Sequence, residues 1–412
     1  MPVPTGRGDP TASFTDMQWY MYHQRNVAFF AAFTARPLSD ADLLLMVEEF
    51  VALTPQVRQG YDDPSPGAPL PAALLKRLIH RQSVPTLAGF PDRWVDDGAA
   101  VFSDPALPLF RVRYAEAETA DANDHVGFLI VQVAHALVEG ADSALLSRSQ
   151  SAAHPVTTSP YRAEPLVRAA AVAMGAVLAA LHLLAGNLYA PHPGPFRYAS
   201  RVVPRHTITV MARELGVRQR ALLFGLVMET LFGAASGRRR KLTTTYSVID
   251  DGGGASRDSF MRMRMRFASF AGAEGFVAFA RAVDAQLSAA EVRESGFNDE
   301  INAEGIRNHR RWRRRVPGLY RPRLFAFMPY DLVLGLIPPH RLGGGLTAHL
   351  REPVFAGASL EGANACVIVP GRDVVTFNFY IQDQLLSRIP RLDELLRAPV
   401  QSSDVHLTMA NP

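Results

Sequence analysis

The sequence predicts an α/β protein with two domains, and three observations support this prediction. The chain has 412 residues, of which 48% are hydrophobic and 20% charged, enough for two cores of roughly 180 to 200 residues each. Apolar runs rich in β-branched residues, such as 126–133, occur beside segments with helical periodicity, such as 40–53. Residues 147–164 are rich in Ser, Thr, Pro and Ala, a composition typical of a linker.

The helices are predicted from their capping signals. A helix over 40–53 follows the N-cap candidate Ser39, repeats apolar residues at helical spacing, and ends before Thr54-Pro55. Gly216 has the position of a C′ residue after a helix over 205–215. The remaining predicted elements are helices over 72–81 and 219–234 and strands over 109–114, 126–133, 260–267 and 365–369.

The strand over 126–133 leads directly into His135, and Gly140 then breaks the apolar pattern. A histidine in the loop after a buried strand can be held rigidly while it faces a cleft. A general base needs this placement, because the imidazole must lie within hydrogen-bond reach of the substrate proton. The alternative is a core histidine whose nitrogens are satisfied by backbone groups. The residues that follow His135 favour the catalytic interpretation.

The run His-Ala-Leu-Val-Glu-Gly at 135–140 resembles the HHxxxDG motif in its HHALVDG form. This form is similar to that of the wax ester synthase/diacylglycerol acyltransferase family, within the wider superfamily of acyl-CoA-dependent acyltransferases and condensation domains. Ala134 replaces the first histidine of the family's pair, and Glu139 replaces the aspartate. The resemblance implies that His135 is the catalytic base. It also implies that Glu139 keeps the loop in shape through a salt bridge and that Gly140 belongs to the same catalytic motif.

The same resemblance implies a fold and a domain order. The expected fold has two chloramphenicol-acetyltransferase-like domains, each a mixed sheet flanked by helices, with the active-site channel between them. The N-terminal acyltransferase domain with the His135 motif would cover 1–147. A crossover with an apolar helix would cover 148–190, and the C-terminal acyltransferase-like domain would cover 191–412.

Two further groups are candidate substrate-binding residues. In a strand, alternation places Arg262, Arg264 and Arg266 on one face. That face is either solvated or borders an entrance for the phosphates of coenzyme A, since arginine suits phosphate. Asn364 and Asn378, on C-terminal strands, are candidate donors to a tetrahedral oxyanion.

Composition and motifs exclude several classes of protein. The net charge of +4 is small for this length, and no zinc finger, basic zipper or RNP-like pattern occurs, so no nucleic-acid partner is expected. The single cysteine, Cys366, excludes an intrachain disulfide framework and fits a reducing compartment. No metal-ligand pattern, P-loop or Gly-x-Ser-x-Gly elbow is found, so we expect no metal and no covalent serine mechanism.

The sequence also bears on location. No apolar signal segment opens the chain, so we expect a cytoplasmic protein. The apolar stretch 166–185 favours a buried or interfacial helix over a membrane span. The basic run 309–315, which contains Trp312, is either a solvated face or an anchor on the inner face of the membrane or on lipid droplets.

The predicted function is that of an O-acyltransferase. It would move an acyl group, expected to be long, from acyl-CoA to an alcohol such as a fatty alcohol or diacylglycerol. Acyl-CoA is a co-substrate in this prediction, and no bound cofactor is expected. Two alternatives remain: the same fold could condense an ester or amide with another acceptor, or it could bind a lipid or partner without catalysis. The change to Ala134 and the lack of the family's Asn-Asp pair and SNVPGP loop favour the non-catalytic alternative.

Overall fold

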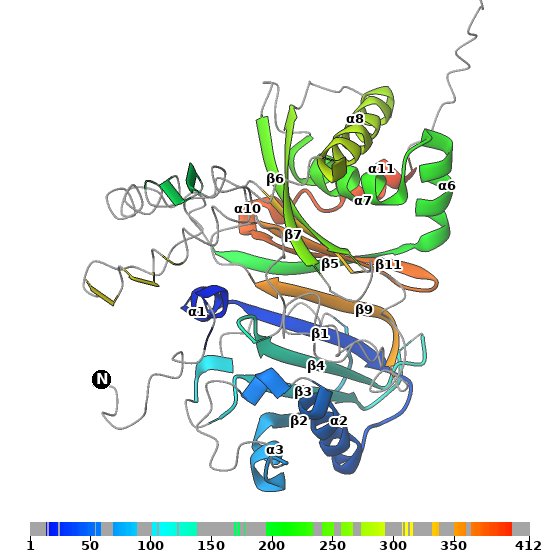
Figure 1. Ribbon diagram of the computed structural model, residues 1–412. Coiled ribbons are helices and arrows are strands. Elements are labelled where there is room, and N and C mark those ends of the chain that lie inside the picture. Colours follow the sequence, from blue (N-terminus) through cyan, green and yellow to red (C-terminus); the bar gives the residue numbers. More distant parts are fainter. Residues whose placement is uncertain are drawn as a thin grey trace, which may run out of the picture.

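The computed structural model contains two mixed β-sheets, one stacked above the other, with helices on their outer faces (Figure 1). The predicted α/β class with two mixed sheets flanked by helices is confirmed. The structure describes residues 14, 16–23, 25–53, 55–58, 69–88, 101–104, 107–121, 123–137, 169–170, 172–173, 177, 195–233, 241–250, 257–266, 273–292, 307, 310–311, 314–315, 332–337, 350–359 and 364–397.

The first sheet has five strands, four of them from the first third of the chain. In spatial order these are β2 (Ile79–Val84), β3 (Phe110–Ala117), β4 (Gly127–Ala134), β1 (Val27–Thr34) and β9 (Leu350–Ser359). Only β2 and β3 run parallel to each other. The strand β4, which leads to His135, is central and buried along its whole length.

Three helices contribute to the core of this first sheet: α1 (Asp16–His23), α2 (Asp40–Leu53) and α3 (Ala72–Leu78). The helix predicted over 40–53 is confirmed, and its N-terminus has the expected cap. The Asp42 N–H donates to the Ser39 hydroxyl at 3.1 Å, and the Ser39 N–H donates back to the Asp42 carboxylate at 2.8 Å. Such reciprocal capping is worth about 0.5–2 kcal/mol, and it explains why the start of this helix is readable from sequence.

The second sheet has six strands. In spatial order these are β5 (Phe196–Pro204), β11 (Val374–Gln382), β10 (Ala365–Pro370), β8 (Leu332–Leu336), β6 (Lys241–Asp250) and β7 (Arg257–Arg266). The helices that pack with it are α6 (Arg205–Leu215), α7 (Gln219–Met228), α8 (Ala273–Val292), α10 (Asp383–Leu386) and α11 (Arg391–Arg397). Their apolar faces form a separate core cluster on the outer side of this sheet.

The helix over 205–215 is confirmed, and Gly216 follows it in the left-handed conformation with a φ of 65°. The helix expected over 219–234 is α7 followed by a π-helical turn, Glu229–Gly233. The prediction of a helix over 72–81 is wrong at its C-terminal end, because α3 stops at Leu78. The chain continues as β2, whose backbone groups pair with β3. Pairing with a distant strand overrides local helix propensity there.

Along the described strands the chain passes between the sheets three times, after β4, after β8 and after β9. It leaves the second sheet after β8, adds β9 to the edge of the first sheet, and returns to the second sheet at β10 (Figure 1). The first sheet is therefore completed by a strand from late in the chain. The expected crossover at 148–190 lies almost entirely outside the described residues.

A third, smaller cluster joins the two sheets, and we call it the seam. Phe29 of β1 meets Tyr198 of β5 edge to face, with ring centroids 5.4 Å apart. Gly357 of β9 makes room for Phe29, because a Cβ there would lie 3.0 Å from the phenyl ring. The Tyr198 hydroxyl donates to the Asn378 side-chain oxygen at 2.7 Å. The seam thus fixes β1 and β9 against β5 and β11.

Candidate active site and interdomain pocket

His135 lies immediately after β4, and its backbone is fixed on the first sheet. Its N–H donates to the Asn26 carbonyl at 2.8 Å, one residue beyond the β1–β4 ladder. The preceding Ala134 N–H donates to the Leu109 carbonyl at 2.8 Å. Leu137 is buried in the core of the first sheet and closes a turn on Ala134 with a 2.9 Å hydrogen bond. The His135 side chain is half-buried, so a rigid backbone presents a partly accessible imidazole.

The rest of the motif is only partly described. Glu139 and Gly140 lie outside the described residues, and their expected roles stay predictions. Ala134, at the position of the family's first histidine, is fully buried in the core of the first sheet. The larger imidazole would have to displace packed neighbours at this site.

The two asparagines lie in the second sheet, where their amides are engaged. Asn378 is buried, and its amide donates to the Val367 carbonyl at 3.0 Å while its oxygen accepts from Tyr198. The side-chain oxygen of the buried Asn364 accepts from the Gln382 N–H at 2.9 Å. Their role toward an oxyanion stays a prediction.

The predicted strand with Arg262, Arg264 and Arg266 exists as β7, paired antiparallel with β6, but these side chains lie outside the described part of the structure. In the basic run 309–315, Arg310 donates to the Phe14 carbonyl at 2.9 Å, and Trp312 lies outside the described residues. Cys366 is buried in β10, and burial raises the pKa of its thiol.

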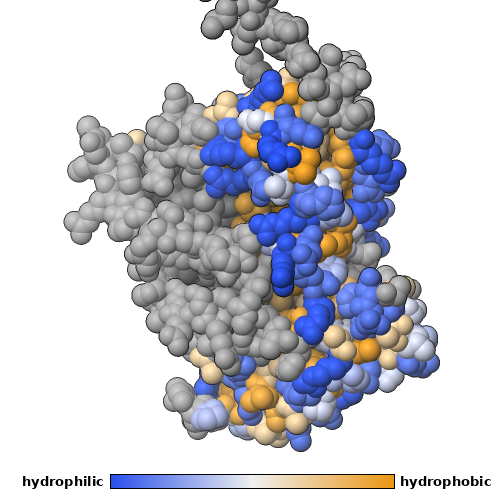
Figure 2. Space-filling view, turned by 90° about the vertical axis from the view of Figure 1, so that its right-hand side faces the viewer, coloured by the Kyte–Doolittle hydropathy of each residue, from blue (hydrophilic) through white to orange (hydrophobic). Residues whose placement is uncertain are grey.

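Two general features of the described residues bear on function. They contain no group of three or more His, Cys, Asp or Glu side chains arranged to hold a metal ion. None of the helices within this part of the chain has the length and apolar character of a membrane span. On the face drawn in Figure 2, hydrophilic residues interrupt the apolar surface of the described part.

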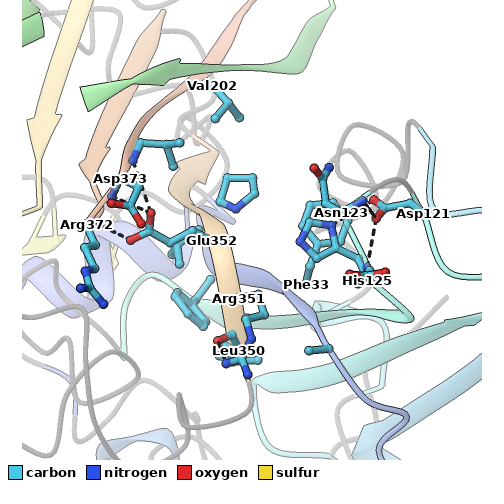
Figure 3. A pocket seen from close by; sticks show the side chains of 16 residues that line it. Phe33, Asp121, Asn123, His125, Val202, Leu350, Arg351, Glu352, Arg372 and Asp373 are labelled. Atoms are coloured by element: carbon cyan, nitrogen blue, oxygen red, sulfur yellow. Dashed lines mark hydrogen bonds and ion pairs between the residues drawn. The ribbon is translucent and has the colours of Figure 1, made fainter. Parts of the chain in front are cut away.

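A pocket of about 1110 Å³ opens between the two sheets, at the end of β4 opposite to His135. Its polar loop, 121–125, and His135 lie at the two ends of the eight-residue strand β4, a span of roughly 23 Å, and the lining reaches along β1 as far as Phe30, which pairs with Val131. The first sheet supplies the end of β1, the loop before β4 and the start of β9, while the second sheet supplies β5 and the β10–β11 hairpin (Figure 3). The lining includes Phe33, Asp121, His125, Val202, Glu352 and Asp373.

One wall of this pocket contains a histidine–carboxylate pair. His125 Nδ1 lies 3.0 Å from the Asp121 carboxylate, and the His125 ring stacks on Phe33 at 4.4 Å with an interplanar angle of 7°. Burial alone would raise the pKa of Asp121, but hydrogen bonds from the N–H groups of His125 and Asn123 and from the His125 ring outweigh it. The pKa of Asp121 is therefore lowered.

The opposite wall contains a contact between the sheets. Glu352, at the start of β9, accepts hydrogen bonds from the N–H groups of Arg372, Asp373 (3.1 Å) and Val374 (3.3 Å) in the β10–β11 hairpin (Figure 3). The carboxylate approaches so closely that a Cβ on Gly371 would lie 2.5 Å from its oxygen. We call this arrangement the Glu352 clamp.

Comparisons with known proteins identify the fold. No protein-family model and no curated protein matches the sequence. Among solved structures, the TRI3 trichothecene 15-O-acetyltransferase from Fusarium sporotrichioides matches with a TM-score of 0.57 and 12% identity, covering 91% of each chain. The wax ester synthase/diacylglycerol acyltransferase from Marinobacter aquaeolei VT8 matches with a TM-score of 0.50 and 12% identity, over 93% of this chain and 96% of that one.

This chain has the two-domain acyltransferase fold. The EpoB cyclization-docking bidomain from Sorangium cellulosum shares it, with a TM-score of 0.50 and 15% identity, over 97% of this chain and 88% of that one. The acyltransferase fold therefore spans nearly the whole sequence.

The pocket, the Asp121–His125 pair and the Glu352 clamp are not predicted by the sequence. A local signal existed for the pair, because Asp121 and His125 lie four residues apart in a polar loop directly before the predicted strand. No local signal existed for the clamp, since Glu352 and Gly371 meet only when the two sheets pack together.

Proposed function

We propose that the protein is an acyltransferase that moves a long acyl group from acyl-CoA to the hydroxyl of a lipid alcohol. The observation that carries the proposal is the placement of His135: a half-buried histidine, anchored through its backbone directly after the central strand of a sheet, in a chain with the acyltransferase fold. The trichothecene acetyltransferase and the wax ester synthase share this fold and are named for O-acyl transfer.

In this proposal, transfer proceeds in one attack. His135 Nε2 accepts the proton of the acceptor hydroxyl while the hydroxyl oxygen attacks the thioester carbonyl carbon. The tetrahedral intermediate collapses with cleavage of the carbon–sulfur bond. The imidazolium then returns its proton to the thiolate of coenzyme A. No acyl-enzyme forms, and no metal takes part.

A substrate screen tests the proposal. Acyl-CoAs of short to long chain are crossed with fatty alcohols, diacylglycerol and amines, and mass spectrometry detects the acylated product while a thiol reagent detects free coenzyme A. We expect an ester product and matching thiol release, both lost in His135→Ala. Acylated amines in place of esters would point to condensation with another acceptor. If acyl-CoA binds but no pair of acyl-CoA and acceptor gives an acylated product or free coenzyme A, the result would contradict a catalytic role.

A further inference from the structure

The pocket between the sheets has an apolar interior and a rim of mixed charge. Its apolar lining comes from both sheets and consists of Phe30, Phe33, Leu350, Pro353, Val354, Val202 and Val374. Two carboxylates, Asp124 and Asp373, and two guanidinium groups, Arg351 and Arg372, are exposed among its lining residues. With Asp121 and Glu352, the lining holds four carboxylates against two guanidinium groups, so its charge favours a neutral or cationic molecule over an anion. A volume of about 1110 Å³ is enough for a small organic molecule.

His125 is the polar centre of this pocket. Its side chain is only 6% exposed, and the stacked Phe33 ring fixes its plane. An ionised carboxylate only accepts hydrogen bonds, so Asp121 holds the proton of a neutral imidazole on Nδ1. Nε2 then carries the lone pair, and no described residue pairs with it. A nearly buried acceptor at a pocket wall, with no donor among the residues that the structure describes, has its hydrogen bond available for a ligand.

The neighbouring carboxylates do not compete for this role. Asp121 accepts from the backbone N–H groups of Asn123 and His125 as well as from the imidazole ring. Glu352 accepts from three backbone N–H groups of the hairpin. Both carboxylates are thus satisfied within the protein, so His125 Nε2 is the nearly buried acceptor of the lining, whereas the carboxylates of Asp124 and Asp373 are exposed to solvent.

We propose that this pocket is a ligand site for a small apolar molecule that carries one hydroxyl or ammonium group, with that group donating to His125 Nε2. The site goes beyond the proposed acyl transfer, because it lies at the opposite end of β4 from His135. Since its walls come from both sheets, an occupant also contacts both and stabilises their packing against each other.

Binding of three matched probes to the full-length protein, without an acyl donor, tests the site. The probes are 2-phenylethanol, 2-phenylethylamine and ethylbenzene, which share a shape but differ in their donor group. Calorimetric titration should show that 2-phenylethanol or 2-phenylethylamine binds about tenfold more tightly than ethylbenzene, the difference expected for one buried hydrogen bond. The relative affinity of the two donors distinguishes a hydroxyl ligand from an ammonium ligand.

Two tryptophan variants locate the binding. Val202 lines the pocket and is 43% exposed, whereas Val210 on α6 is 38% exposed and lies outside the pocket lining. Val202→Trp should fill the pocket and weaken binding at least about tenfold, while Val210→Trp should bind like the wild type.

A third variant tests the hydrogen bond to His125. His125→Phe keeps an aromatic ring against Phe33 and should abolish the advantage of the donor probes over ethylbenzene.

Three results would overturn the site: no binding of any probe to the wild type at millimolar concentration, equal affinity of all three probes, or wild-type affinity in Val202→Trp. Circular dichroism checks that each variant is folded. If His125→Phe does not fold, the Val202→Trp and Val210→Trp pair still decides the question. Because no acyl donor is present, the outcome is independent of whether acyl transfer is observed.

Discussion

At the scale of single residues, backbone hydrogen bonds fix the place of His135. Its own N–H is bound to Asn26, and that of Ala134 is bound to Leu109, so strands on both sides hold the end of β4. The imidazole therefore extends from a Cα that can move little. A general base requires such support, because an error of about 1 Å in its position can remove much of its effect.

The Asp121–His125 pair predicts a specific pH dependence. The pKa of Asp121 is lowered in the folded state, so its contribution to stability is present above the unfolded value near 4 and is lost as the pH falls through the folded pKa. We expect Asp121→Asn to lower the free energy of unfolding by about 1 kcal/mol at pH 7. Urea unfolding from pH 3 to pH 7 should show this difference shrink below pH 4. A difference independent of pH would contradict the assignment.

At the scale of elements, the Glu352 clamp shows how a strand and a hairpin are joined across the sheets. The carboxylate at the start of β9 binds three N–H groups of the β10–β11 hairpin. Arg205 at the start of α6 donates to the Gly371 carbonyl of the same hairpin at 2.8 Å. The hairpin is thus held both by the first sheet and by a helix of its own domain.

A double-mutant cycle tests the clamp. Glu352→Ala should cost about 1–3 kcal/mol, because three N–H groups lose a charged acceptor. Gly371→Ala should cost a similar amount, since its Cβ would lie 2.5 Å from the Glu352 carboxylate. In the Glu352→Ala background the same Gly371→Ala change should cost less than about 0.5 kcal/mol. Additive costs in chemical denaturation would show that the two residues do not act on each other.

The elements differ in how well the sequence predicts them. The helix over 40–53 and the one over 205–215 are predicted to the residue, because Ser39 is a local start signal and Gly216 is a local stop signal. The sequence does not predict β1 or β9, and it predicts a helix where β2 begins, because each of these segments is a strand only through pairing with a distant partner. The pocket could not be predicted at all, since its walls come from segments that meet only in the folded chain.

At the scale of the whole molecule, the seam determines how the two sheets pack. Phe29 and Phe355 of the first sheet pack with Tyr198 and Tyr380 of the second. Gly357 of β9 leaves space for the ring of its cross-strand neighbour Phe29, and this ring contacts Tyr198 of the second sheet. A reaction that uses groups from both sheets would depend on this packing. The fold class and the position of His135 directly after a buried strand could be predicted from the sequence, whereas the relative placement of the sheets depends on these long-range contacts.

Removal of one hydroxyl tests the seam. Tyr198→Phe keeps the edge-to-face contact with Phe29 but leaves the buried Asn378 oxygen without its 2.7 Å hydrogen bond. We expect a loss of about 1–3 kcal/mol in the free energy of unfolding, the usual cost of a buried unsatisfied acceptor. Thermal and urea unfolding measure it. Wild-type stability in this variant would show that this hydrogen bond, which joins β5 to β11 within the second sheet, does not support Tyr198 in the seam.

The most direct test of the central claim is the turnover of His135→Ala with the best acyl-CoA and acceptor pair. A positioned general base contributes about 100- to 10,000-fold, so kcat should fall by that factor while the affinity for acyl-CoA changes little. His206→Ala, the same substitution at an exposed position on α6, is the matched control and should retain wild-type turnover. A kcat in His135→Ala equal to that of the control would contradict the proposed mechanism.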